Sequence, residues 1–368
     1  MTDSIFDPQF QVTERIRLTL DDIERQSWLI ENMLLMPKYE TWIQREVHIK
    51  RASGTTRIEG AQLDEKAVAH LQKRGFGGQL SDDERANINA LDAYEFVNYL
   101  SEQQDIPIDE LVVRELNRQF IRGFDRTLTP GVYRKGQNTV GGYSPPDQGD
   151  VPGLMRSFSL WLRQDDSDLH PVLKAGLAHI HLVAIHPFWD GNGRTARGLS
   201  TLVLQRSKWG FRKLLSSEAS LFTIQGEYFR AIERTLGRGF SRDYDATLWL
   251  EFFTGALKND ADSLVQVLTE WHRLAGELHE QLEQDGVSAR QADAIFFTSF
   301  TGQITRSDYV EIARVSPATA SRDLDHLLKI GYLIAEGKTR NRVYRLVRPE
   351  HRPEPKSDET QLTLPEIP

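Results

Sequence analysis

The chain has 368 residues, enough for two or three domains. Its 45 Lys and Arg against 53 Asp and Glu give a net charge of −8, so bulk charge alone does not hold it on DNA or an anionic membrane. There is no cysteine, which excludes disulfides, thiolate catalysis and cysteine-ligated metal sites. A polar N-terminus and the lack of a long apolar run argue against a secretory signal and a membrane span, and we expect a cytoplasmic protein.

Helical periodicity covers most of the chain. A helical region is predicted over 12–50, followed by helices over 64–74 and 81–101. Ser81 precedes three acidic residues, which predicts a capped N-terminus for the last of these helices. Further helices are predicted over 109–122, 153–164, 171–186, 194–208, 226–236 and 243–258.

Two other segments break this helical pattern. Residues 127–152 are rich in Gly, Pro, Asn and Thr, and two short extended pieces there, Val132–Arg134 and Thr139–Tyr143, predict a hairpin. Residues 286–350 show three helices followed by two strands, after a long polar helix that is predicted to connect them to the rest.

The segment HPFWDGNGRTAR, His186–Arg197, lies between two apolar helical runs. Pro187 ends the first helix because it cannot donate a hydrogen bond within it. Gly191 and Gly193 let the backbone approach a ligand closely. The unpaired amides that open the next helix, together with its dipole, predict a site for a phosphate.

The side chains of this segment add chemistry to the predicted phosphate site. Asp190 offers a hard oxygen ligand for Mg²⁺. Arg194 and Arg197 lie three residues apart, on one face of a helix, and can bind phosphates as forks. His186 can accept a proton from a hydroxyl near neutral pH. A base, a metal ligand, an anion site and two arginines so close together predict transfer at phosphorus.

The same segment resembles the signature of the Fic (filamentation induced by cAMP) family, HPFxDGNGRxxR, at every fixed position. The resemblance extends from about 110 to 255 and implies a mainly α protein: an all-helical Fic core with a small β-hairpin flap. It also implies an AMP transferase. Such an enzyme binds ATP with Mg²⁺, moves AMP to a Ser, Thr or Tyr hydroxyl of a target protein, which can be the enzyme itself, and releases pyrophosphate.

The resemblance implies a role for each residue of the loop. His186 would deprotonate the attacking hydroxyl, and Asp190 would hold Mg²⁺ at the α- and β-phosphates. The other implied phosphate contacts are Gly191, Asn192 and Gly193 at the α-phosphate, Arg194 at the β-phosphate and Arg197 at the γ-phosphate.

Two further segments resemble nucleotide-facing parts of the family. Residues 131–146 resemble the flap, which pins the acceptor segment of the target by strand pairing. A pair of neighbouring aromatic residues resembles the pair near the adenine and ribose, where the family usually has two tyrosines. Ordinary core aromatics and a plain surface hairpin are the alternatives. The residues implied here are Val140, Gly141, Gly142, Tyr143, Tyr228 and Phe229.

The upstream segment TTRIEG resembles the inhibitory motif of autoinhibited Fic proteins, [S/T]xxxE[G/N], with Thr55 first and Glu59 and Gly60 last. A glutamate aimed at Arg197 would form a charge-assisted pair and occupy the arginine needed for the γ-phosphate. ATP could still bind, but with its α-phosphorus poorly aligned for attack. The alternative is that Glu59 is an ordinary surface glutamate.

Residues 286–350 are predicted to form a winged helix-turn-helix domain. A core followed by a C-terminal winged helix resembles the arrangement of many Fic proteins. Thr305 and Ser316-Pro317 predict the starts of two of its helices. The region holds ten Lys or Arg against seven Asp or Glu, so DNA is a candidate partner and a protein is the alternative. The residues that would reach DNA are Thr319, Ser321 and Arg322 on the recognition helix and Lys338, Arg340 and Arg342 in the wing.

The predicted function is therefore an autoinhibited protein adenylyltransferase. Two alternatives are a DNA-binding regulator whose Fic core senses a nucleotide, and a hydrolase in which Glu59 activates water to remove AMP from a modified target. Contacts of the N-terminal region or of the winged helix could form a homodimer, and no membrane partner is expected. The predicted domains are an inhibitory helical region over 1–108, the Fic core over 109–258, a connector over 259–285, the winged helix over 286–350 and a disordered tail over 351–368.

Overall fold

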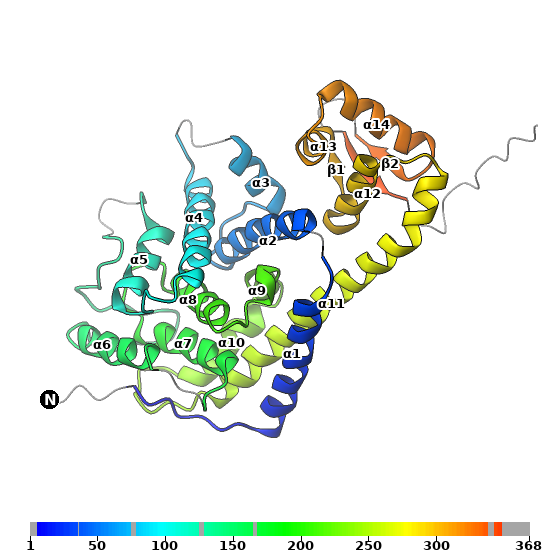
Figure 1. Ribbon diagram of the computed structural model, residues 1–368. Coiled ribbons are helices and arrows are strands. Elements are labelled where there is room, and N and C mark those ends of the chain that lie inside the picture. The colour runs from blue at the N-terminus through cyan, green and yellow to red at the C-terminus, as the bar shows by residue number, and fades with distance from the viewer. Residues whose placement is uncertain are drawn as a thin grey trace, which may run out of the picture. The chain divides into compact units, whose positions relative to one another are not determined.

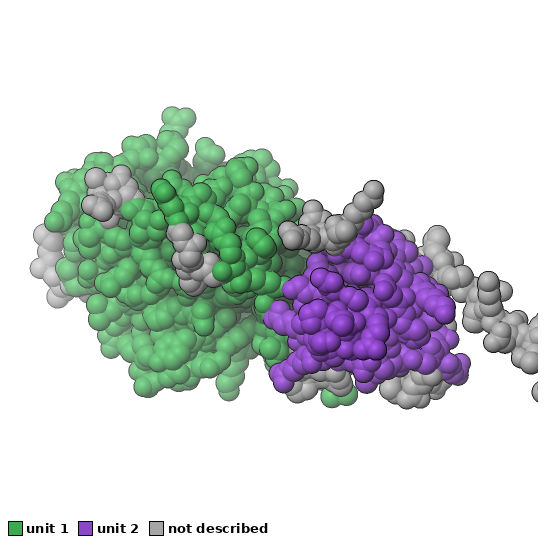
Figure 2. All heavy atoms as spheres, turned by 90° about the horizontal axis from the view of Figure 1, so that it is seen from above, with its two compact units in different colours: residues 1–265 green, residues 266–368 purple. Residues whose placement is uncertain are grey.

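The computed structural model of the chain describes residues 6–35, 37–74, 79–124, 129–164, 168–337 and 342–347. Within these ranges the protein is mainly helical, with one small three-stranded sheet near the C-terminus, which confirms the predicted fold class. The chain divides into two compact units, residues 1–265 and residues 266–368 (Figure 2). No helix in the described ranges combines the length and the apolar character that crossing a membrane requires.

Four helices precede the core (Figure 1). The region 12–50, predicted as helical throughout, is broken ahead of Pro37, because proline lacks an amide to continue a helix and disfavours helical geometry in the residue before it. Ser81 forms the predicted cap, reinforced by Glu84 as a capping box. These helices are α1 (Glu14–Asn32), α2 (Pro37–Ile58), α3 (Glu65–Arg74) and α4 (Asp82–Glu102).

The core is built around two consecutive helices that carry the candidate loop between them. The first is apolar on all sides and almost wholly buried, as a central core helix must be. The second packs against it and also against α4 and α5 (Figure 1). The core helices are α5 (Glu110–Ile121), α6 (Val151–Leu162), α7 (Pro171–Ile185) and α8 (Asn192–Arg206).

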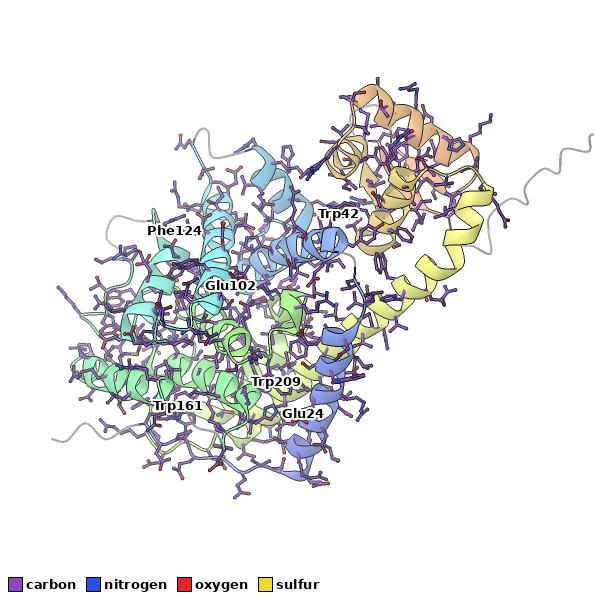
Figure 3. The ribbon with its side chains drawn as sticks, in the orientation of Figure 1. Glu24, Trp42, Glu102, Phe124, Trp161 and Trp209 are labelled. Atoms are coloured by element: carbon purple, nitrogen blue, oxygen red, sulfur yellow. The ribbon has the colours of Figure 1, made fainter. Side chains whose placement is uncertain are left out.

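Aromatic side chains tie the outer segments to this core. Trp161 of α6 packs edge-on against Phe6, with ring centroids 5.3 Å apart, and Trp209 lies 4.7 Å from the ring of His170 (Figure 3). Phe6 in turn stacks on His181 of α7 at 3.4 Å. The segment before α1 therefore covers the core helices that hold the candidate site.

The chain after α8 contains two short helices that the sequence analysis did not predict, η1 (Phe211–Lys213) and α9 (Ser217–Thr223). They are followed by α10 (Gln225–Leu236) and by α11 (Thr247–Gln284), one continuous helix of 38 residues. The helix predicted over 243–258 and the predicted connector over 259–285 are thus a single helix, although the polarity changes near 258. No proline interrupts this stretch, and a change of polarity alone does not end a helix.

The second unit has the predicted order of three helices followed by two strands, with a further short strand between the first two helices. The predicted caps at Thr305 and Ser316 are both present. The expected wing residues Lys338 and Arg340 and the expected tail lie outside the described residues. The elements are α12 (Ala289–Thr301), β1 (Ile304–Thr305), α13 (Arg306–Ala313), α14 (Pro317–Lys329), β2 (Leu333–Glu336) and β3 (Val343–Leu346), in the antiparallel sheet order β1-β3-β2.

Candidate active site

The loop between α7 and α8 is held in a specific backbone conformation at both of its ends. His186 caps α7 with left-handed dihedrals, φ 49° and ψ 57°. Gly191 caps the start of α8 with φ 78°, and a Cβ there would lie 2.5 Å from Cγ2 of Ile121. Gly191 is therefore required both for its dihedral angles and for the close approach of α5.

Two asparagine side chains hold the loop closed. Nδ2 of Asn192 donates to the carbonyl of Phe188 at 2.9 Å, and its Oδ1 accepts from the amide of the same residue at 3.0 Å. Asn117 of α5 donates to the carbonyl of Asp190 at 2.9 Å. The side chain of Asn192 is thus used within the loop, and its backbone amide, with those of the next two residues, opens α8 without an intrahelical partner.

Asp190 and Arg194 form an ion pair one helical turn apart, with Oδ2 3.0 Å from Nη2. The carboxylate also accepts a hydrogen bond of 2.6 Å from the amide of Gly191 and is 44% exposed, whereas the arginine is buried. Among the described residues no group of three or more His, Asp and Glu side chains is arranged to hold a metal ion. Asp190 is the carboxylate that the 186–191 loop offers to a cation.

Arg197 lies buried on α8 and is bound by the end of α2. Its Nη2 is 2.6 Å from Oε1 of Glu59, and its Nε and Nη2 donate to the side chain and the carbonyl of Thr55 at 2.8 and 3.1 Å. Glu59 also lies directly over Gly193, where an added Cβ would meet Oε1 at 2.5 Å. Gly60 follows at the end of α2 with φ 101°.

The two candidate aromatic residues have different surroundings. Tyr228 is fully buried; its hydroxyl accepts from Nη1 of Arg197 at 3.3 Å and lies 3.0 Å from Nε2 of His179. Burial and Arg197 lower the pKa of His179 to about 3, so its imidazole is neutral where it shares a hydrogen bond with the tyrosine hydroxyl. Phe229 is exposed beside Tyr228, with ring centroids 5.1 Å apart. The geometry thus joins Tyr228 to the arginine and leaves Phe229 facing solvent.

Burial lowers the pKa of His186 to about 4, and the nearby Arg134 lowers it too. Glu59, Asp190 and a hydrogen bond with the backbone of Val183 act in the opposite direction. The imidazole is therefore neutral at pH 7 and able to accept a proton.

The predicted hairpin is not formed by Val132–Arg134 and Thr139–Tyr143. The second piece closes on itself instead, since Val140 and Tyr143 exchange backbone hydrogen bonds of 3.0 Å around Gly141 and Gly142. The hydroxyl of Tyr143 donates to the carbonyl of Ala184, two residues before His186, which fixes this turn beside the loop. Val140, Gly141 and Gly142 are exposed. The first piece does not pair with it, since the backbone amide of Arg134 donates to the carbonyl of Pro187 at 2.9 Å instead.

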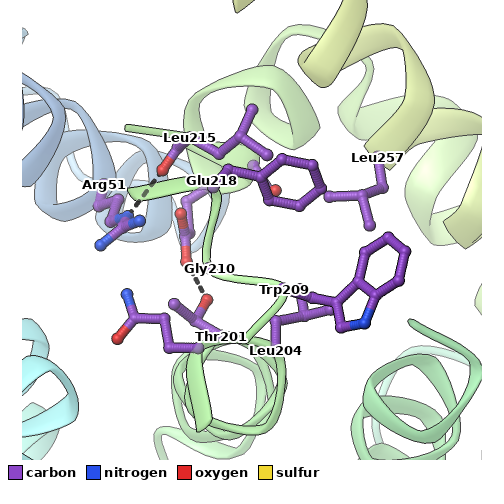
Figure 4. Close-up of a pocket in the computed structure, with 11 residues that line it drawn as sticks. Arg51, Thr201, Leu204, Trp209, Gly210, Leu215, Glu218 and Leu257 are labelled. Atoms are coloured by element: carbon purple, nitrogen blue, oxygen red, sulfur yellow. Dashed lines mark hydrogen bonds between the residues drawn. The ribbon is translucent and has the colours of Figure 1, made fainter. Parts of the chain in front are cut away.

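Helix α2, which precedes Glu59 directly, is docked along the segment 211–225. Nε of Arg51 donates to the carbonyl of Leu215 at 2.9 Å, at the edge of a small cavity where Thr201 of α8 also binds Glu218 (Figure 4). Gln225 of α10 donates to the carbonyl of Ile58 at 2.8 Å.

Between these two contacts α2 and α9 meet backbone to backbone. A Cβ on Gly54 would lie 2.6 Å from the backbone nitrogen of Ala219 and 2.6 Å from the carbonyl carbon of Glu218. Glu59 is therefore placed by the docking of α2 as a whole, and the sequence analysis did not identify Gly54 or Arg51.

With this geometry described, comparison with known proteins identifies the loop and the helices around it. Residues 107–204 match the Fic/DOC family. This chain carries a domain of the Fic/DOC family. The matched range of the Fic domain runs from α5 through the loop to α8, so it contains every residue of the predicted His186–Arg197 segment.

Relatives with curated names support the same assignment over a larger part of the chain. The chain is 34% identical over 240 residues to the protein adenylyltransferase Fic of Drosophila sechellia, covering 61% of this chain and 45% of the relative. It is 33% identical over 314 residues to the protein of the same name from Drosophila persimilis, covering 79% of this chain and 58% of the relative. The chain thus spans about half the length of these relatives.

Solved structures agree on the fold. A Fic family protein from Desulfovibrio desulfuricans aligns with a TM-score of 0.61 at 21% identity, over 93% of this chain and 98% of the other. A Fic domain containing signaling protein from Bacteroides thetaiotaomicron aligns with a TM-score of 0.57 at 22% identity, over 69% of this chain and 95% of the other. At these identities the likeness concerns the fold.

Proposed function

We propose that the protein is an autoinhibited protein adenylyltransferase, which transfers AMP from ATP to a Ser, Thr or Tyr hydroxyl of a target protein or of itself. One observation carries the proposal: a neutral, half-buried His186 stands at one end of the Fic loop, while Glu59 binds Arg197 on the helix that follows the loop. The names of the Drosophila relatives support the same reaction.

In this proposal the free amides at the start of α8 bind the α-phosphate, with the helix dipole favouring negative charge there. Arg194 and Arg197 bind the β- and γ-phosphates. His186 takes the proton of the incoming hydroxyl as its oxygen bonds to the α-phosphorus, and pyrophosphate leaves with the electrons of the bond that breaks.

Mg²⁺ suits the donor set at the loop, because this ion commonly binds one or two carboxylates and completes its shell with phosphate oxygens and water. Asp190 is a single, partly exposed carboxylate and fits that requirement. When bound, the ion would neutralise charge on the phosphates. Arg194 would have to exchange its bond to Asp190 for one to a phosphate.

Inhibition follows from the position of Glu59. Its carboxylate occupies Nη2 of Arg197 and lies over Gly193, so both the arginine and the space above the loop are taken. A triphosphate that binds beside it must place its γ-phosphate elsewhere, and its α-phosphorus is then misaligned with the attacking oxygen.

A direct test of the reaction is intact-mass measurement of the purified protein and its Glu59→Gly variant after incubation with ATP and Mg²⁺. A gain of one AMP moiety per modified site fixes the reaction class and the donor together. The proposal would be contradicted if neither protein gained AMP and if neither transferred AMP to proteins added from a cell extract.

The docking of α2 gives a second way to release the inhibition. Gly54→Ala places a methyl group against the backbone of α9, which cannot yield as a flexible side chain would, so α2 must shift and weaken the pair of Glu59 with Arg197. We expect the rate of self-transfer of AMP to rise about tenfold. This factor corresponds to lowering the activation free energy of transfer by about 1.4 kcal/mol.

The matched control is Gly255→Ala on α11, where an added Cβ meets no atom within 4 Å. Initial rates with labelled ATP are compared for both variants below their melting temperatures. A folded Gly54→Ala protein with the parental rate would show that this contact does not place Glu59.

The low pKa of His186 predicts an unusual pH dependence. A base with an ordinary imidazole would lose activity as the pH falls through about 6.5. Burial lowers the pKa of His186 to about 4. We therefore expect kcat/KM of the Glu59→Gly variant to stay level well below pH 6.5 and to fall only as the pH approaches about 4. The check is the pH profile of kcat/KM, and an acid limb at or above pH 6.5 would contradict the geometry given to the base.

The C-terminal unit enters the proposal as a winged helix, on the order of its helices and strands. Binding of DNA by its Thr319, Ser321 and Arg322 stays a prediction, tested by gel shift with random-sequence duplexes. Three of its arginines pair with acids inside the unit, which favours the alternative of a protein partner. These pairs are Arg290 with Asp323, Arg342 with Asp325 and Arg345 with Glu336. The homodimer, the cytoplasmic location and the domain boundaries also stay predictions.

A further inference from the structure

Arg134 is a buried arginine that binds backbone carbonyls from separate segments. Its side chain is 2% exposed and forms no ion pair with the described carboxylates. Nε donates to the carbonyl of His186 at 3.0 Å, Nη1 to that of Gly136 at 3.0 Å, and Nη2 to that of Pro146. Its backbone amide donates to the carbonyl of Pro187 at 2.9 Å. A single residue thus binds both ends of the 136–146 part of the flap and the loop that carries the base.

The bond to His186 concerns a residue in an unfavourable conformation. Left-handed dihedrals are uncommon for residues other than glycine, and they persist where the surrounding structure fixes them. The amide of His186 is bound to Leu182 at 3.0 Å, and its carbonyl is bound by Arg134. The direction of the imidazole therefore depends on both of these bonds.

The other two bonds close the flap. Gly136 and Pro146 lie at the two ends of the segment that includes the Val140–Tyr143 turn, and the guanidinium holds their carbonyls together. Gln137 adds a bond of 2.9 Å to the carbonyl of Pro145. The exposed turn is consequently fixed at its base by the same side chain that fixes His186.

We propose that Arg134 is a positioning residue, which holds the flap and His186 as one unit so that an acceptor hydroxyl lying along the flap meets the imidazole. This inference rests on the proposed transferase function. The planar guanidinium of Arg134 has N–H donors in several fixed directions, and it can therefore reach all three carbonyls at once. A lysine carries its donors on one nitrogen and cannot span them.

The charge of Arg134 acts on the base in addition to its hydrogen bonds. The charged groups that face His186 are Arg134 from the flap, Glu59 directly after α2 and Asp190 from the loop. The guanidinium opposes protonation of the imidazole, and the two carboxylates favour it. Loss of the guanidinium charge should therefore raise the pKa of His186, whereas a lysine should largely preserve it.

The test compares Arg134→Lys and Arg134→Met in the Glu59→Gly background, where transfer is not inhibited. Both should lower the rate at saturating ATP by about 10²-fold, as expected for a misplaced base, with the ATP concentration for half-maximal rate changed by less than about threefold. Arg134→Met should also move the acid limb to higher pH, while Arg134→Lys should leave it near the parental position.

The matched control is Arg206→Met. Arg206 is also partly buried and donates to two backbone carbonyls, those of Leu100 and Ile106, away from the loop. The Arg206→Met substitution should lower the melting temperature without changing the transfer rate at saturating ATP or the pH profile of that rate. If the Arg134 variants behaved like this control, or if Arg134→Lys kept the parental rate, the proposal would be overturned.

A second readout separates this inference from the proposed function. Titration of the imidazole by NMR, with the His186 signal assigned by its absence in His186→Ala, should show a higher pKa in Arg134→Met than in the parent. If the Glu59→Gly background transferred no AMP, the proposed function would fail, and the titration would still decide whether Arg134 acts on His186. An unchanged pKa would count against the inference in either case.

Discussion

Replacing Glu59 by glycine is expected to raise AMP transfer by about 10²-fold or more, the scale of rate lost when a reacting group is misplaced. In the structure Oε1 of Glu59 lies 2.6 Å from Nη2 of Arg197 and covers Gly193. The substitution removes both contacts at once. Arg197 keeps its bonds to Thr55 and Tyr228, so it stays oriented toward the site and gains one free N–H donor on Nη2 for the γ-phosphate.

Initial rates with labelled ATP measure this increase, and Glu14→Gly is the matched control. Glu14 also pairs with an arginine, Arg17, but on the exposed surface of α1, where the loss of an ion pair has little effect. A second consequence is testable without catalysis. Arg197 without Glu59 is a buried cation that lacks its carboxylate, so ATP should raise the melting temperature of the variant more than that of the parent. Equal transfer rates for parent and Glu59→Gly would remove the inhibitory role.

The helical core could be predicted from the sequence because its helices are long and carry a clear apolar period. The errors fall where that signal is short or indirect. α9 has seven residues, too few to show a period, and it is nevertheless the surface on which α2 docks. The local composition of the Val132–Tyr143 region predicts a hairpin, whereas Arg134 in this region bonds instead to the backbone of His186, Pro187 and Pro146.

The residues of the candidate site also fall into those that the sequence predicted and those that it did not. The loop from His186 to Arg197 is one continuous segment, so its chemistry could be read directly. The pairing of Glu59 with Arg197 joins residues 138 positions apart, and only the resemblance of the upstream motif indicated it. Gly54 and Arg134 carry no motif that we recognised. Their roles come from the distance between two helices and from the direction of three carbonyl groups, which are properties of the folded chain.

Replacing His186 by alanine is expected to abolish most of the transfer while leaving ATP bound. A general base contributes roughly 10²–10⁴-fold to the rate, and the loss should fall in that range when measured in the Glu59→Gly background. The phosphate contacts proposed here come from the start of α8 and from Arg194 and Arg197, none of which requires the imidazole. Calorimetric titration with ATP and Mg²⁺ should therefore give similar affinities for the parent and the variant.

The control for this experiment is His181→Ala, because burial lowers the pKa of His181 as it does that of His186, but His181 contacts Tyr244 in the core, with Nδ1 3.1 Å from its hydroxyl. That variant should lose stability and keep its transfer rate below its melting temperature. The comparison separates loss of a proton acceptor from loss of a buried ring. A His186→Ala protein that labelled itself at the parental rate would show that His186 is not the group that removes the proton.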